Sequence, residues 1–223
     1  IDTFPPDPTN STSASFTFHI TEAGSTFECK LDSGAWGSCT SPKDYSSLSQ
    51  GSHTFQVKAT DVAGNTDATP ASFTWLIDIT APTVTDFKIN GLVKPGIVIT
   101  NSAVTITWTA TDTGGSGIDH VELWRAPDVG GVPVGWGQVG ANMPPGTTST
   151  TDLPPAEGAW WYGIHVLDKT QPAKNCITEA GGHCGGVTSD SLDVRPSKGP
   201  LVVVFDNIPP VVSFDIPPTP GAG

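Results

Sequence analysis

The sequence is poor in charged residues, and positive charge is the scarcer kind. Only 14% of its 223 residues are charged, against about a quarter in ordinary globular proteins. The 22 Asp and Glu outnumber the 10 Lys and Arg, which gives a formal net charge of −12. Nucleic acids and anionic membranes are bound by clustered basic residues. We therefore expect no nucleic-acid partner.

Long hydrophobic runs are also missing. The longest one near the C-terminus is Leu201–Phe205, far short of the about twenty apolar residues that a membrane-spanning helix needs. We therefore expect no membrane insertion. The chain begins at Ile1 without a signal peptide or an initiating Met, so we expect a processed product or a piece of a longer protein.

The motifs of the common catalytic classes are absent. There is no Gly-x-Ser-x-Gly, no His-Glu-x-x-His and no phosphate-binding glycine loop. Ser116 lies among glycines in a segment typical of a turn. The five histidines are scattered, and His165 alternates with apolar neighbours, which predicts that it faces solvent. We expect the protein not to be an enzyme and to hold no resident cofactor.

The chain is rich in the turn-forming residues Gly and Pro, and it contains short segments in which apolar and polar residues alternate. Its 25 Gly and 21 Pro make up about a fifth of the residues, and no stretch has a helical period. Apolar and polar residues instead alternate with period two, which is typical of half-buried strands. Strands are expected at residues 13–21, 26–31, 36–39, 53–61, 71–77, 84–89, 104–110, 118–124, 136–139, 160–167 and 201–205.

The strand pattern stops and restarts near residues 78–82, which predicts a domain boundary. Two successive sets of short strands joined by turns favour an all-β protein of two β-sandwiches in tandem. We expect one domain at residues 1–79, a second and larger one at 80–207, and a linker with a further strand at 208–223.

The four cysteines form two local pairs. Cys29 and Cys39 are ten residues apart, and Cys176 and Cys184 are eight residues apart. This locality favours two disulfides over the other connectivities, and disulfides indicate an extracellular or cell-surface location. The alternative is a zinc site that includes His183, although neither pair has the short spacing of zinc knuckles. A glycosylation sequon begins at Asn10.

The first half of the chain resembles a bacterial immunoglobulin-like repeat. The likeness lies in Ser-Ala-Ser-Phe-Thr-Phe, Glu-Ala-Gly-Ser-Thr-Phe-Glu-Cys, Leu-Asp-Ser-Gly-Ala-Trp, Gly-Ser-His-Thr-Phe-Gln-Val and Ala-Thr-Asp-Val-Ala-Gly-Asn, between residues 13 and 65. Thr-Trp-Thr-Ala-Thr-Asp from residue 107 resembles the same superfamily more loosely. The resemblance implies an immunoglobulin-like fold and a non-catalytic role as a spacer, stalk or adhesin segment of a large secreted or surface protein.

The two ends of the chain look complementary. Residues 209–216 resemble a linker followed by the first strand of a further domain, with Val212, Phe214 and Ile216 on one face. At the other end, residues 5–10 leave no room for the usual first strand before the second one. Two interpretations follow: one period of a tandem-repeat chain, or a head-to-tail filament in which each tail strand completes the next subunit's first domain.

Asp61, Asn65 and Asp67 place three short oxygen-bearing side chains in one turn. Calcium is held by six to eight such oxygens, backbone carbonyls included, so this turn is a candidate calcium site. The alternative is a turn in which Asp61 and Asn65 bond local backbone amides.

Seven tryptophans are many for this length. Alternation assigns Trp75, Trp108 and one of the adjacent Trp160 and Trp161 to the cores. Trp124, Trp136 and Trp161 are candidates for an exposed platform that stacks on sugar rings; the alternative is that they form an inter-domain contact or cover a long loop.

These observations favour a non-catalytic extracellular structural module that forms a fibre or stalk. Its expected partners are copies of itself arranged head to tail, or neighbouring repeats of the same chain. The alternative is a carbohydrate-binding or adhesive accessory module of a secreted enzyme or adhesin, whose partners would be glycans.

Overall fold

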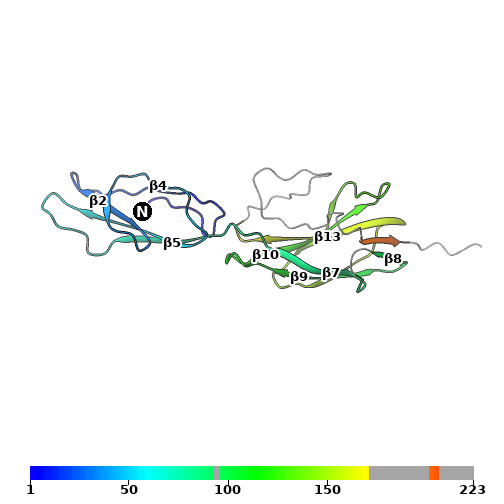
Figure 1. The fold of residues 1–223 in the computed structure, drawn as a ribbon. Helices are drawn as coiled ribbons and strands as arrows, with labels where there is room; N and C mark the ends of the chain where they lie inside the picture. The colour runs from blue at the N-terminus through cyan, green and yellow to red at the C-terminus, as the bar shows by residue number, and fades with distance from the viewer. Residues whose placement is uncertain (93–95, 171–200, 206–223) are drawn as a thin grey trace, which may run out of the picture.

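The computed structural model describes residues 1–92, 96–170 and 201–205. All regular structure in these residues is β-strand, and the strands form two sandwiches that follow one another along the chain (Figure 1). The expected all-β architecture of two sandwiches in tandem is confirmed. Among the described residues no helix is long and apolar enough to cross a membrane.

The first sandwich consists of six strands. A four-stranded sheet, in the order β3-β2-β5-β6, faces a two-stranded sheet of β1 and β4. All pairs in these sheets are antiparallel. The strands are β1 (Ala14–Phe16), β2 (Thr26–Leu31), β3 (Gly37–Cys39), β4 (Lys43–Tyr45), β5 (Gly51–Thr60) and β6 (Ala71–Ile77).

Aromatic rings fill the core of this sandwich. Phe16 stacks on Phe55 with 4.2 Å between ring centroids, and Trp75 meets Phe16 edge-on at 5.2 Å. Trp75 is buried, as alternation predicts. The expected apolar face of residues 13–21 holds through Phe18, whereas Ile20 is 39% exposed because the regular pairing of β1 ends before it.

Residues 1–9 lie where a first strand of this sandwich would be. They form no strand, but Thr3 pairs with Thr17 next to β1, and Thr9 pairs in parallel with Ile77 at the end of β6. Ile1 packs against the aromatic core, and Phe4 stacks on Phe73 at 4.1 Å. This segment thus contacts both sheets without forming a regular strand. Its prolines lack the backbone N–H that a regular hydrogen-bond ladder needs.

The described residues of the second sandwich form eight strands. A five-stranded sheet in the order β11-β10-β13-β14-β8 faces a three-stranded sheet, β12-β9-β7. In the larger sheet β8 runs parallel to β14, and its other pairs are antiparallel. The strands are β7 (Thr83–Ile89), β8 (Gly96–Thr100), β9 (Val104–Thr111), β10 (Ile118–Pro127), β11 (Gly137–Met143), β12 (Ser149–Asp152), β13 (Gly158–Asp168) and β14 (Leu201–Phe205).

The core of the second sandwich is mainly aliphatic. Val104, Ile106 and Trp108 on β9 are buried against the facing sheet, as their alternation predicts. Strands β10 and β13 differ from that pattern because consecutive residues along them are buried. Both faces of these two strands are therefore covered, and polar side chains on the outer face are buried with the apolar ones.

Candidate functional site

The proposed sugar platform does not form. Trp124 is only 6% exposed and Trp161 only 4%, while Trp136 is partly buried. The indole N–H of Trp124 donates to Glu122 at 2.9 Å, and that of Trp161 donates to Asp128 at 3.0 Å. Alternation correctly directs these rings away from the main core, but the outer face of the sheet is covered, so the prediction of exposure was wrong.

A buried cluster around Glu122 is the most polar feature of that outer face. Glu122 on β10 lies directly opposite His165 on β13, and both side chains are buried. His165 Nδ1 lies 3.0 Å from Glu122 Oε2, and His120 Nε2 lies 3.3 Å from Oε1. The prediction that His165 faces solvent was wrong, because β13 is buried on both faces.

The carboxylate of Glu122 is held in its charged form. Burial by itself raises its pKa, but the hydrogen bonds from His165 and Trp124, with the charge of His165 and the bond from His120, outweigh burial and lower the pKa. A carboxylate with three donors and a lowered pKa is a structural anchor and not a poised general acid. Sequence patterns give no signal for this cluster, since it depends on strand register.

A second polar cluster involves the same two strands and β12. Arg125 and Tyr162 are opposite each other in the β10–β13 register, and both bind the carboxylate of Asp152 at the end of β12. The Tyr162 hydroxyl donates to Asp152 Oδ2 at 2.5 Å, and the Arg125 guanidinium lies 5.3 Å from the Trp160 ring centroid. Burial, and then the neighbouring carboxylate, raise the pKa of Tyr162. The phenol therefore stays protonated and links the two sheets.

The disulfide between Cys29 and Cys39 is formed. It joins β2 to β3, and Cys29 is buried in the aromatic core. This part of the cysteine prediction is confirmed, and it excludes Cys29 and Cys39 as zinc ligands. Cys176 and Cys184 lie outside the described residues, as do Val212, Phe214 and Ile216 of the tail.

The candidate calcium turn has the geometry of the alternative interpretation. Asp61 Oδ1 accepts the backbone N–H of Asn65 at 2.8 Å, and Oδ2 accepts the Asn65 side-chain amide at 2.7 Å. These bonds lower the pKa of Asp61. Asp67 Oδ1 accepts the backbone N–H and the hydroxyl of Thr69. Over the part of the chain that the structure describes, no group of three or more His, Cys, Asp or Glu is arranged to hold a metal ion.

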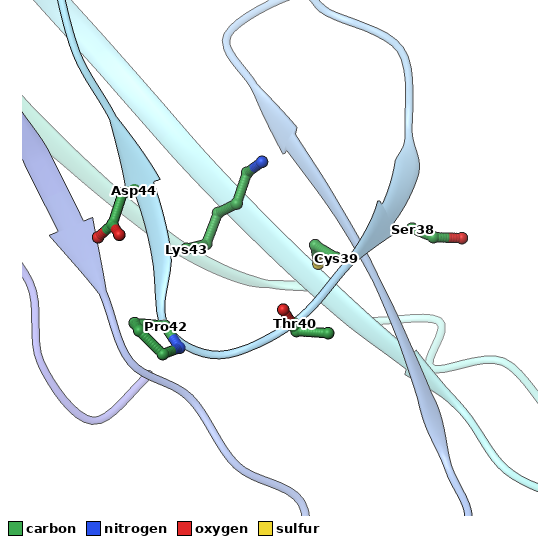
Figure 2. A pocket seen from close by; sticks show the side chains of 6 residues that line it. All are labelled: Ser38, Cys39, Thr40, Pro42, Lys43 and Asp44. Atoms are coloured by element: carbon green, nitrogen blue, oxygen red, sulfur yellow. The ribbon is translucent and has the colours of Figure 1, made fainter.

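The surface has a shallow depression on the first sandwich, between the edge strands of its two sheets (Figure 2). Its lining is polar except for Pro42 and the disulfide-bonded Cys39; the other residues are Ser38, Thr40, Lys43 and Asp44. Figure 2 shows these side chains spread along β3, β4 and their connection, and not converging on one point. Such an open groove offers no enclosed binding cavity.

No family model and no curated protein matches the chain. Among solved structures it is similar to the fibronectin(III)-like modules of Clostridium thermocellum CbhA, with 14% identity and a TM-score of 0.44 over 89% of this chain and 88% of that one. It is also similar to the chicken CNTN1 FN1–FN3 domains, with 13% identity and a TM-score of 0.37 over 74% of this chain and 60% of that one.

Proposed function

We propose that this chain is a non-catalytic spacer or stalk module of an extracellular or cell-surface protein. The arrangement of the two sandwiches carries the proposal. They lie end to end, and the chain passes directly from β6 into β7 and reaches β14 at the end of the second sandwich farthest from the first (Figure 1). Modules joined in this way add length with every repeat, which is what a stalk requires.

The chemistry of the described residues supports the same role. The Cys29–Cys39 disulfide fits an oxidising environment. The ionisable side chains around Glu122 and Asp152 are hydrogen-bonded to their neighbours. Groups held in this way stabilise a sandwich and do not turn over a substrate.

The partner that we propose is a neighbouring module of the same chain. Exchange of a strand between copies would require a vacant first-strand position in the first sandwich. Ile1, Thr3 and Thr9 already contact its core and the edges of both sheets. A donated strand would have to displace them, so the spacer role is the simpler proposal.

Light scattering coupled to size-exclusion chromatography, with small-angle X-ray scattering on the same fractions, tests this proposal. We expect an elongated monomer with a maximum dimension close to two sandwiches in line. A glycan array and a panel of glycosidase and peptidase substrates run in parallel. Filaments of the intact chain, saturable glycan binding or turnover of any substrate would each contradict the spacer role.

A further inference from the structure

The connection between the two sandwiches contains a buried carboxylate. Asp78 follows β6 directly and is only 1% exposed. Its backbone N–H donates to the carbonyl of Thr9 at 2.9 Å, which holds the residue in the first sandwich. Its side chain reaches the second sandwich, where Oδ2 accepts the backbone N–H of Ser116 at 2.9 Å. One residue is therefore bonded to both bodies.

The turn that receives Asp78 is held in shape by its own carboxylate. Asp112 Oδ1 accepts the N–H of Gly114 at 2.8 Å, and Oδ2 accepts the N–H of Gly117 at 2.6 Å. These bonds lie within the β9–β10 connection, so the Ser116 N–H is positioned without help from the first sandwich. A preorganised donor loses little entropy when it meets Asp78.

The fit between Asp78 and this turn depends on Gly114, which has no side chain. A methyl group placed on Gly114 would lie 1.7 Å from Asp78 Oδ1 and 2.5 Å from Oδ2. Such contacts are far inside van der Waals distance, and the carboxylate is fixed on both sides by hydrogen bonds. Gly114 does not have a left-handed φ, so its role here is to leave space and not to permit an unusual backbone.

Gln50 forms hydrogen bonds with the residues between β6 and β7, next to this contact. Gln50 Oε1 accepts the hydroxyl of Thr80 at 2.7 Å and the N–H of Ile79 at 3.4 Å. Its Nε2 donates to the carbonyl of Gly114 at 3.4 Å. Gln50 comes from the first sandwich just before β5, so a second side chain spans the same joint.

We infer that this joint is a lock that holds the two sandwiches as one rigid body, with Asp78 seated against Gly114 and Ser116. Without it the few residues between β6 and β7 would act as a hinge, the default for tandem modules with small interfaces. The lock rests on the contacts named here and holds whether or not the chain serves as a spacer.

NMR alignment of the intact chain tests the lock. Residual dipolar couplings from two rigidly joined domains fit one alignment tensor, whereas domains that reorient require two. We expect one tensor for the unchanged protein and loss of the common tensor in Gly114→Ala. The matched control is Gly137→Ala on β11, where an added methyl group meets nothing within 4 Å and the tensor should stay common. Separate tensors in the unchanged protein, or one tensor in Gly114→Ala, would overturn the inference.

A double-mutant cycle separates the lock from a general loss of folding. Asp78→Ala removes the three atoms that come nearest to the added methyl group of Gly114→Ala, so the clash is relieved. We expect the double variant to resemble Asp78→Ala alone in its tensors, a non-additivity that only direct contact produces. Amide chemical shifts within each sandwich should stay native-like in every variant. Simple addition of the two effects would argue against the lock.

Discussion

The two sandwiches are stabilised by different kinds of residues. The first closes around aromatic rings, with Phe16 in contact with both Phe55 and Trp75, and a disulfide ties its edge strand to the sheet. The second closes mainly around aliphatic residues and adds two charged clusters, one buried around Glu122 and one partly buried around Asp152.

The difference follows from the number and length of the strands in each sandwich. In the first, a two-stranded sheet of three-residue strands covers the four-stranded sheet. Large aromatic rings and a disulfide therefore provide stability that such a small apolar area would not provide by itself. In the second, β10 and β13 are ten and eleven residues long and covered on both faces. The outward side chains of Glu122 and His165 must then pair with one another.

The largest effect should come from the aromatic core. Phe16 is fully buried and contacts four other aromatic rings. Phe16→Ala should lower the free energy of unfolding of the first sandwich by about 3–5 kcal/mol, because both the transfer energy and a cavity are lost. Urea unfolding followed by tryptophan fluorescence and NMR measures this. Phe4→Ala, at a ring that is 54% exposed, is the control and should have a much smaller effect; equal effects would contradict the description of this core.

Loss of the disulfide should come next. Replacing both Cys29 and Cys39 by Ala frees a loop of ten residues, which corresponds to about 2.5 kcal/mol of lost stability. The loss should be confined to the first sandwich, and the transition of the second should not move. If the second sandwich loses the same stability, the two sandwiches unfold as one unit and the disulfide does not act on the first alone.

Disruption of the Glu122 cluster in the second sandwich should cause a slightly smaller loss of stability. Glu122→Gln keeps the shape but places an amide among donors, so we expect a loss of about 2 kcal/mol in that sandwich alone. Its pKa is lowered in the folded state. The stabilisation is therefore present above the ordinary Glu pKa of about 4.3 and disappears as pH falls through the lower folded value.

A pH series of unfolding midpoints checks both statements. The unchanged second sandwich should weaken as the solution is made acidic, and the Glu122→Gln variant should weaken less over the same interval. The first sandwich of the variant serves as the internal reference. Parallel pH curves for the two proteins would show that Glu122 does not carry this dependence.

The sequence predicts much of the fold where alternation is regular. β2 and β6 have the expected bounds, and the buried residues of β9 are those that period two selects. β4, β8 and β12 were not expected, because strands of three to five residues without an apolar–polar rhythm have no periodic signal. Their positions are fixed by pairing with neighbouring strands.

The polar sites lie beyond such patterns for a different reason. Glu122 faces His165 because of the β10–β13 register, which shifts between Ile118 and His120. Asp78 meets Ser116 from 38 residues away. Alternation tells which way a side chain points, but not what covers that face of the sheet, so the burial of Trp124 and Trp161 was missed.

The smallest effect should be at the joint. Burial, together with the nearby carboxylates of Asp78 and Asp112, raises the pKa of Asp168 despite two hydrogen bonds from Thr170. A raised carboxyl pKa means that the charged form is disfavoured on folding, so stability falls as pH rises from about 4 toward the folded pKa.

Asp168→Asn keeps an acceptor for Thr170 and removes the charge. We therefore expect it to leave the second sandwich as stable at neutral pH or stabilise it by less than about 1 kcal/mol, whereas Asp168→Ala should destabilise it. A clear loss of stability in Asp168→Asn would mean that the charge of Asp168 stabilises the fold despite the nearby carboxylates of Asp78 and Asp112.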